Sequence, residues 1–258
     1  MSKHQTNITA HSGCDGTEDN SMAFVHYALE QGADCLEVDV RAAADGTLVL
    51  GHDGIDGKAV RLSEVFSALR ERPEVRINCD LKEPGLEQPV YALAEQFGVE
   101  GQLIYSGTVA LETLSQKTVL FPKAEIYLNI EQLQPELEAP QSGKTMEEGE
   151  MKTLIREALL KASQYDQLSC INMEYHLLTK ETLQELKKRN LTASAWTVNE
   201  AEAARRLLSD GIANITTRAL KTTLRLRAEL EQGAGQACGS HGAAPETEAF
   251  SRAEGRQQ

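Results

Sequence analysis

Short runs of apolar and β-branched residues alternate with amphipathic helical segments along most of the chain. The runs that predict strands are, in order, NITAHS (7–12), CLEVDV (35–40), RINCDL (76–81), LIYSG (103–107), EIYLNI (125–130), CINMEY (170–175), TASAWTV (192–198) and ANITT (213–217). Strands that alternate with helices are typical of a parallel sheet with crossover helices. Eight such strands predict an α/β protein with a closed (β/α)8 TIM barrel.

One segment interrupts this alternation between the second and third predicted strands. In DGTLVLGHDG (45–54), Asp45 and Gly46 form a hairpin-turn signal, and the run ends in His52 and Asp53. We therefore expect a small hairpin insertion after the second strand, on the rim of the barrel.

The sequence predicts where two of the helical segments begin. LSEVFSALRER (62–72) predicts a helix that starts at Ser63 or just before it, and TKETLQELKKRN (179–190) predicts a helix with Thr179 as its N-cap. Their apolar positions recur at helical spacing, which favours faces that pack on the core.

The composition changes near Gln232, where glycine, alanine, serine and charged residues replace large apolar ones. Such a segment buries too little apolar surface to offset the entropy lost on ordering. We predict a barrel over residues 1–231 and a disordered low-complexity tail over residues 232–258.

Bulk properties restrict the function classes. A length of 258 residues suits one α/β barrel, and a net charge of −13 argues against nucleic acid or an anionic membrane as a partner. No signal-peptide core and no apolar run of membrane-spanning length occurs, so a cytoplasmic location is expected. The five cysteines are scattered and lack CxxC spacing, which favours reduced thiols that mainly fill the core.

Titratable residues gather where the first three predicted strands end. They are His11 on the first strand, Glu37 and Asp39 on the second, His52 on the hairpin, and Asp80 and Lys82 on the third. In a (β/α)8 barrel the carboxyl ends of all strands share one face. Residues two apart point to the same side of a strand, so we expect these side chains to meet at one mouth of the barrel.

Three carboxylates, from Glu37, Asp39 and Asp80, would repel one another unless a cation lies between them. Oxygen ligands of this kind suit Mg²⁺ or Ca²⁺, with Mn²⁺ as a further candidate. Zinc is disfavoured because no histidine or thiolate cluster has ligand spacing. The plainer interpretation of Glu37 and Asp39 alone is a solvated strand end.

Four blocks of the sequence resemble, in order, those of the glycerophosphodiester phosphodiesterase family. They are AHSGCDGTEDNSMAF (10–24), GADCLEVDVRAAADGTLVLGHD (32–53), INCDLKE (77–83), and SAWTVNEAE followed by LLSDGIANITTRAL (194–220). The resemblance implies a (β/α)8 barrel of lipid metabolism. Such an enzyme uses a divalent cation to hydrolyse small-molecule glycerophosphodiesters to glycerol phosphate and an alcohol, by way of a cyclic phosphate.

The resemblance also implies roles for single residues. His11 and His52 match the two catalytic histidines, and we prefer His11 as the base and His52 as the acid. The metal ligands would be Glu37, Asp39 and Asp80. The residues expected to contact the substrate are Lys82, Glu18 and Trp196.

One position departs from the family pattern. The family usually has His-Arg-Gly where this chain has His11, Ser12 and Gly13. Serine cannot replace the charge of a bidentate phosphate ligand, which puts phosphate affinity and substrate choice in question.

Three alternatives stay open at this point. They are a barrel lyase that stops at the cyclic phosphate, a catalytically silent phosphodiester-binding barrel, and an unrelated barrel enzyme such as a sugar-phosphate isomerase. The sequence does not indicate the head-group alcohol or the oligomeric state.

Overall fold

Eight parallel strands close into a ring in the computed structural model, which describes residues 5–55, 57–115, 120–138 and 146–239. Strand β1 pairs with both β9 and β2, so the sheet has no parallel edge. The strands of the ring are β1 (Asn7–Ala10), β2 (Cys35–Ala42), β4 (Arg76–Leu81), β5 (Leu103–Gly107), β6 (Glu125–Asn129), β7 (Cys170–Glu174), β8 (Thr192–Trp196) and β9 (Asn214–Thr217). The predicted (β/α)8 barrel is confirmed, since each strand lies within or overlaps its predicted run.

A ninth strand, β3 (Leu48–Leu50), pairs antiparallel with the end of β2 through Val40 and Leu50. This is the predicted hairpin insertion. Gly46 adopts a φ of +84° in its turn, a left-handed conformation that glycine adopts without steric cost.

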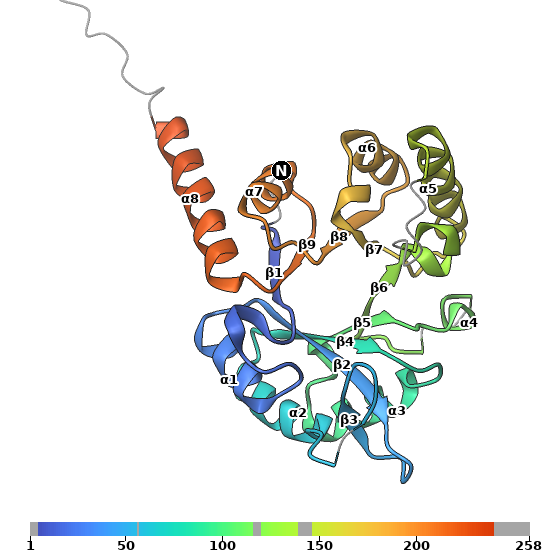
Figure 1. Ribbon diagram of the computed structural model, residues 1–258, viewed down its shortest axis with the longest axis vertical. Coiled ribbons are helices and arrows are strands. Elements are labelled where there is room, and N and C mark those ends of the chain that lie inside the picture. Colours follow the sequence, from blue (N-terminus) through green and yellow to red (C-terminus); the bar gives the residue numbers. More distant parts are fainter. Residues whose placement is uncertain (1–4, 56, 116–119, 139–145, 240–258) are drawn as a thin grey trace, which may run out of the picture.

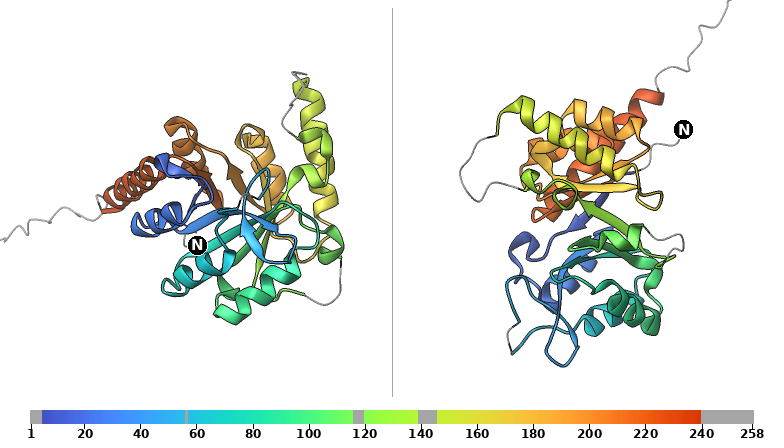
Figure 2. Two further views of the ribbon diagram at one scale, coloured as in Figure 1. Left: turned by 60° about the horizontal axis from the view of Figure 1, so that its bottom comes forward. Right: turned by 90° about the vertical axis from the view of Figure 1, so that its right-hand side faces the viewer.

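Helices surround the ring on its outer side (Figures 1 and 2). They are α1 (Met22–Glu30), α2 (Leu62–Arg70), α3 (Glu87–Phe97), α4 (Leu111–Leu114), α5 (Glu148–Ala162), α6 (Lys180–Lys188), α7 (Ala201–Asp210) and α8 (Leu220–Gly239). The structure confirms the predicted starts of two helices. Helix α2 begins at Leu62, and the Thr179 hydroxyl accepts a hydrogen bond from the Thr182 amide at 3.2 Å to cap α6.

Burial separates the molecule into two apolar layers. The larger layer lies between the ring and the helices and includes the fully buried Phe24, Leu36 and Phe66. A second, small apolar cluster consists of Cys35, Ile104, Tyr127 and Cys170 inside the ring. Successive strand residues alternate between these two environments. The rest of the interior is therefore free to carry polar side chains.

The predicted boundary at residue 232 falls inside α8, which continues to Gly239. Residues 240–258 of the predicted tail lie outside the described residues. The division into a barrel and a tail stays a prediction.

The cysteines agree with the sequence interpretation as far as they are described. Cys14, Cys35, Cys79 and Cys170 are buried and form no disulfide. Burial raises the pKa of the Cys14 thiol to about 12, so its reactive thiolate is scarce near neutral pH. Among the described residues, no helix has the length and apolar character that crossing a membrane requires.

Helix α8 is fastened to the barrel where β1 begins. The Asp34 carboxylate forms an ion pair with Arg227 and accepts a hydrogen bond from the Ile8 amide at 2.7 Å. Arg227 also donates to the Thr6 carbonyl at 2.9 Å. One carboxylate thus joins the first strand, the second strand and the last helix.

Replacing this carboxylate should destabilise the barrel. We expect Asp34→Ala to lower the free energy of unfolding by about 1–3 kcal/mol, because a buried amide and a guanidinium both lose their partner. Glu229→Ala is the control, since Glu229 and Arg205 form an ion pair in which both side chains are about half exposed, 49% and 50%. Its effect should stay within about 0.5 kcal/mol in urea denaturation. Equal effects of the two variants would contradict the role of Asp34.

Candidate active site

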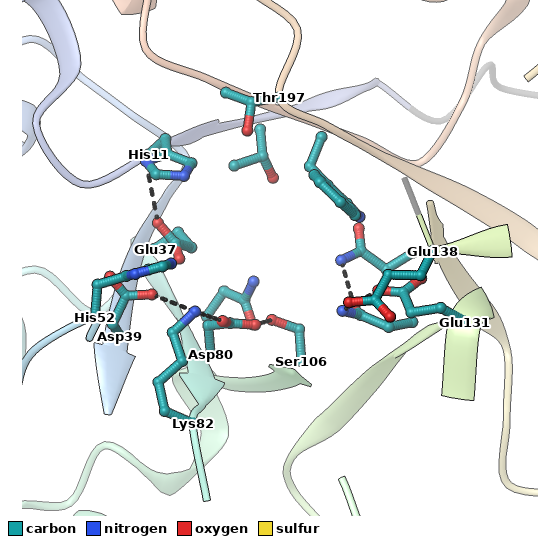
Figure 3. A pocket seen from close by; sticks show the side chains of 15 residues that line it. His11, Glu37, Asp39, His52, Asp80, Lys82, Ser106, Glu131, Glu138 and Thr197 are labelled. Carbon is teal, nitrogen blue, oxygen red and sulfur yellow. Dashed lines mark hydrogen bonds and ion pairs between the residues drawn. The ribbon is translucent and has the colours of Figure 1, made fainter. Parts of the chain in front are cut away.

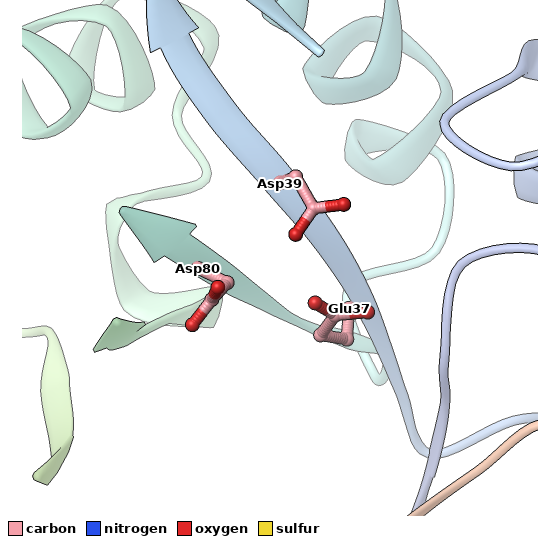
Figure 4. A group of neighbouring side chains, drawn as sticks. All are labelled: Glu37, Asp39 and Asp80. Atoms are coloured by element: carbon pink, nitrogen blue, oxygen red, sulfur yellow. The ribbon is translucent and has the colours of Figure 1, made fainter. Parts of the chain in front are cut away.

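Strand register brings three carboxylates together at the carboxyl ends of two neighbouring strands. Asp39 on β2 lies opposite Asp80 on β4, and Glu37 lies two residues before Asp39 on the same face. Carboxylate oxygens of the three residues lie within 4.8 Å of one another (Figure 4). The parallel pairing of β2 with β4 therefore builds the predicted carboxylate group.

Each carboxylate is held by a neutral hydrogen-bond donor. The Ser12 amide donates to Glu37 at 3.1 Å, and the Asn20 side-chain amide donates to Asp39 at 2.7 Å. The Ser106 hydroxyl donates to Asp80 at 2.7 Å from the neighbouring strand β5. These bonds orient the three carboxylates before any ligand arrives.

The three carboxylates affect one another's pKa because they lie close together in a poorly solvated part of the cavity. Burial raises the pKa of Glu37 to about 7, and the charges of Asp39 and Asp80 add to the effect against the opposing influence of His11. Burial also disfavours the ionised form of Asp39, but the Lys82 ammonium and the Asn20 amide hold its pKa below the usual range. The site thus disfavours the ionised form of Glu37, which a bound cation would favour.

Lys82 supplies the nearest positive charge. Its ammonium nitrogen lies 2.8 Å from Asp39 Oδ1 and 2.5 Å from Asp80 Oδ2. Burial opposes its protonated form, yet the two carboxylates raise the pKa of Lys82 above its usual range. Lys82 therefore remains charged and offsets one of the three negative charges.

The donor set fits a hard divalent cation. All three candidate ligands offer carboxylate oxygen, which is the chemistry that Mg²⁺, Mn²⁺ and Ca²⁺ prefer. With one negative charge offset by Lys82, a divalent cation would balance the other two. The residues that would hold it are Glu37, Asp39 and Asp80.

His11 faces this group from the end of β1 (Figure 3). Its Nδ1 lies 2.8 Å from the Ser12 carbonyl and 3.6 Å from Glu37 Oε2. A carbonyl oxygen only accepts, so Nδ1 carries the proton and Nε2 is left free to accept one. The side chain is 20% exposed, which keeps the ring within reach of a ligand in the cavity.

His52 reaches the site from the hairpin insertion. Its Nδ1 lies 2.8 Å from the Asp53 carboxylate, which only accepts and so fixes the same tautomer. Arg41 donates two hydrogen bonds to the His52 carbonyl, at 3.0 and 2.6 Å, and pairs with Glu83 at 3.1 Å. The hairpin end is thus tied to the ring although the His52 side chain is 65% exposed.

These groups line one cavity of about 370 Å³ at the carboxyl ends of the strands. Its lining residues are His11, Glu37, Asp39, His52, Asn78, Asp80, Lys82, Ser106, Asn129, Glu131, Glu138, Asn172, Trp196, Thr197 and Thr216. The structure therefore brings together all the predicted site residues except Glu18. Trp196 contributes a buried indole Nε1 that has no hydrogen-bond partner in the described part of the chain.

Glu18 lies elsewhere, on the exposed loop after β1. Its side chain lines a separate hollow beside the hairpin, together with Asp19 and His52. In the same loop Asn20, not Glu18, touches the metal-ligand candidates, because its side chain binds both the carboxylate and the amide of Asp39. The predicted substrate contact of Glu18 stays untested.

The structure adds site residues that the sequence analysis missed. Ser106, Asn129, Glu131 and Asn172 lie at or just past the ends of β5, β6 and β7 and line the cavity. The signal for them was present, since the strand-end rule that selected His11 and Asp80 applies equally to the later strands. Asn20 had no comparable signal, because its role arises from loop geometry.

Fold and site together define a (β/α)8 barrel with an acidic, two-histidine cavity at the catalytic face of the fold. Residues 4–68 match the model of the Glycerophosphoryl diester phosphodiesterase family. A glycerophosphodiester phosphodiesterase of Bacillus altitudinis is 27% identical over 149 aligned residues, which cover 41% of this chain. The alignment spans 61% of the length of that relative. The resemblance to the family is thereby confirmed.

Solved structures share the architecture at low sequence identity. A glycerophosphodiester phosphodiesterase from Thermotoga maritima matches with a TM-score of 0.65 and 19% identity, over 86% of this chain and 99% of that one. An Oleispira antarctica phosphodiesterase in complex with the product sn-glycerol-3-phosphate matches with a TM-score of 0.61 and 16% identity, over 86% and 96%. These structural similarities support the barrel fold even though sequence identity to the two proteins is low.

The carboxylate group can be tested by its effect on stability. We expect Mg²⁺, Mn²⁺ or Ca²⁺ to raise the Tm of the protein, because a ligand that binds only the folded state stabilises it, and EDTA should reverse the shift. Asp80→Asn should weaken cation affinity at least about tenfold, since one of three charged ligands is lost. The control variant Glu174→Gln, whose substitution lies outside the cavity, should show the same cation-dependent Tm shift as the parent protein. A full Tm shift in Asp80→Asn would count against this site.

Proposed function

We propose that the chain is a divalent-cation-dependent phosphodiesterase that hydrolyses glycerophosphodiesters to glycerol phosphate and an alcohol. The observation that carries the proposal is the pairing of two histidines, each with Nδ1 engaged, with three convergent carboxylates in one cavity. A binding protein has no need of an acid and a base around such a group.

The two histidines suit complementary proton transfers. His11 with a free Nε2 removes a proton from the substrate hydroxyl next to the phosphate, and its Nδ1 faces Ser12 and Glu37, which stabilise the charged ring. His52, paired with Asp53, donates a proton to the departing alcohol oxygen. The new bond from hydroxyl oxygen to phosphorus forms as the bond to the alcohol breaks.

The product of this first step is a cyclic phosphate and a free alcohol. Water then opens the ring with the roles reversed: His52 takes a proton from water, and His11 returns one to the released hydroxyl. The histidines end in their starting states, so the cycle is balanced in protons. The Lys82 ammonium, which lies 2.5 Å from Asp80 and lines the same cavity, would contribute positive charge toward the phosphate.

A divalent cation on Glu37, Asp39 and Asp80 would stabilise charge that develops on the phosphate and lower the pKa of the attacking hydroxyl. The matched family and the Bacillus relative support this reaction class by their names. The Oleispira structure supports it further, because that protein is seen with sn-glycerol-3-phosphate.

The direct test is an assay by phosphorus NMR against a panel of glycerophosphodiesters, with and without EDTA. Glycerol phosphate formed only with a divalent cation supports the proposal. Accumulation of a cyclic phosphate as the final product would indicate a lyase instead. Absence of any turnover with all three cations would overturn the proposed activity.

Loss of either histidine should impair catalysis without unfolding the protein. We expect His11→Ala and His52→Ala each to lower kcat at least about 10²-fold, the usual contribution of one general acid or base. His26→Ala is the matched control, since His26 is exposed on α1, outside the cavity. Circular dichroism melts should be unchanged in all three variants. Retained turnover in His11→Ala or His52→Ala would remove that residue from the mechanism.

A substrate without the neighbouring hydroxyl separates the two ways of attacking phosphorus. If the nucleophile is the substrate's own hydroxyl, proximity supplies effective molarities of about 10⁵ M or more, and the deoxy compound should bind but turn over negligibly. It should then act as a competitive inhibitor. Direct attack by water predicts hydrolysis of the deoxy compound within about tenfold of the parent, because the lost hydroxyl would be only a binding group.

A further inference from the structure

The cavity wall opposite the carboxylate group has no role in the chemistry described above. It is formed by Asn129 at the end of β6, by Glu131 in the short helix η3 (Ile130–Gln132), by Glu138 and by Asn172 on β7. Figure 3 shows Glu131 and Glu138 facing His11, Asp39 and Asp80 across the cavity. A substrate held at the three carboxylates would therefore extend toward this wall.

Hydrogen bonds fix which atoms this wall presents. The Glu131 carboxylate only accepts, so Asn129 must turn its Nδ2 toward it, at 2.9 Å. Asn129 Oδ1 then faces Asn172 and accepts from Asn172 Nδ2 at 2.8 Å. The Asn172 oxygen is left over: it is buried in a side chain that is 6% exposed, and it has no hydrogen-bond partner among the residues that the structure describes. A buried acceptor without a partner is costly and indicates a ligand that donates.

The charge of the wall is also unbalanced. Among the described residues, no lysine, arginine or histidine forms an ion pair with Glu131 or Glu138. Burial raises the pKa of Glu131, and the charges of Glu138 and Asp80 act in the same direction. Glu131, Glu138 and the Asn172 oxygen thus offer acceptors and negative charge.

We propose that this wall is a subsite for a primary ammonium group on the alcohol that leaves, so that the preferred substrates are glycerophosphodiesters of amino alcohols. The inference rests on the proposed function. An ammonium carries three N–H donors, and three acceptor groups, Glu131, Glu138 and Asn172, face it. A sugar or glycerol hydroxyl would supply donors without the positive charge, and a trimethylammonium would supply the charge without donors.

An isosteric series tests the subsite. The compounds are glycerophosphodiesters of ethanolamine, ethylene glycol and propanol, which end in an ammonium, a hydroxyl and a methyl group on the same chain length. We expect kcat/KM for the ammonium compound to exceed that for each of the others at least tenfold. In Glu131→Gln, which keeps the size of the side chain and removes its charge, the ratio of ammonium to methyl compound should fall at least tenfold.

Glu136→Gln is the matched control, because Glu136 is an exposed glutamate five residues away that does not line the cavity. Its selectivity should equal that of the parent. Equal kcat/KM for the three compounds, or unchanged selectivity in Glu131→Gln, would overturn the subsite.

Failure of the proposed function is distinguishable from failure of the subsite. If none of the compounds is hydrolysed, the subsite can still be tested by calorimetric titration of the same compounds into the full chain. Tighter binding of the ammonium compound that is lost in Glu131→Gln supports the subsite, and equal binding of all three compounds overturns it.

Discussion

The repulsion among three carboxylates in a poorly solvated cavity is the constraint on which the rest of the site depends. Glu37, Asp39 and Asp80 cannot all carry charge at such short range without compensation. The chain supplies part of it through Lys82 and through hydrogen-bond donors on the loop after β1 and on β5. The remaining negative charge favours cation binding, because a bound cation would relieve the repulsion among the carboxylates.

The barrel tolerates this arrangement because its two apolar layers are so unequal. Packing between the ring and the helices provides nearly all of the core, and the separate apolar cluster around Tyr127 is small. The other inward positions carry hydrogen-bonded polar groups, as where Thr9 donates to Asn214 at 2.6 Å. Stability and chemistry thus occupy opposite faces of the same strands.

Sequence patterns were sufficient for features that depend on local periodicity. The eight strands, the hairpin at Gly46 and the cap at Thr179 all follow from residues close in the chain. The group of Glu37, Asp39 and Asp80 was also accessible, because parallel strands end on one face. Contacts set by loop geometry were not accessible: Asn20 binds Asp39 across 19 residues, and nothing in its neighbours distinguishes it from Glu18. The extent of α8 past residue 232 was missed because glycine and alanine hide a helix that apolar spacing does not mark.

The serine at position 12 shows how loop geometry changes the meaning of a residue. Ser12 is 1% exposed, and its hydroxyl accepts a hydrogen bond from the Asn20 amide at 2.5 Å, so its side chain fastens the loop rather than facing a ligand. A guanidinium still lies beside this loop. Arg218, just after β9, pairs with Asp19 at 2.9 and 3.0 Å, and its charge interacts with Glu37 and Asp39. The guanidinium beside this loop thus comes from Arg218, just after the last strand of the ring, and not from position 12.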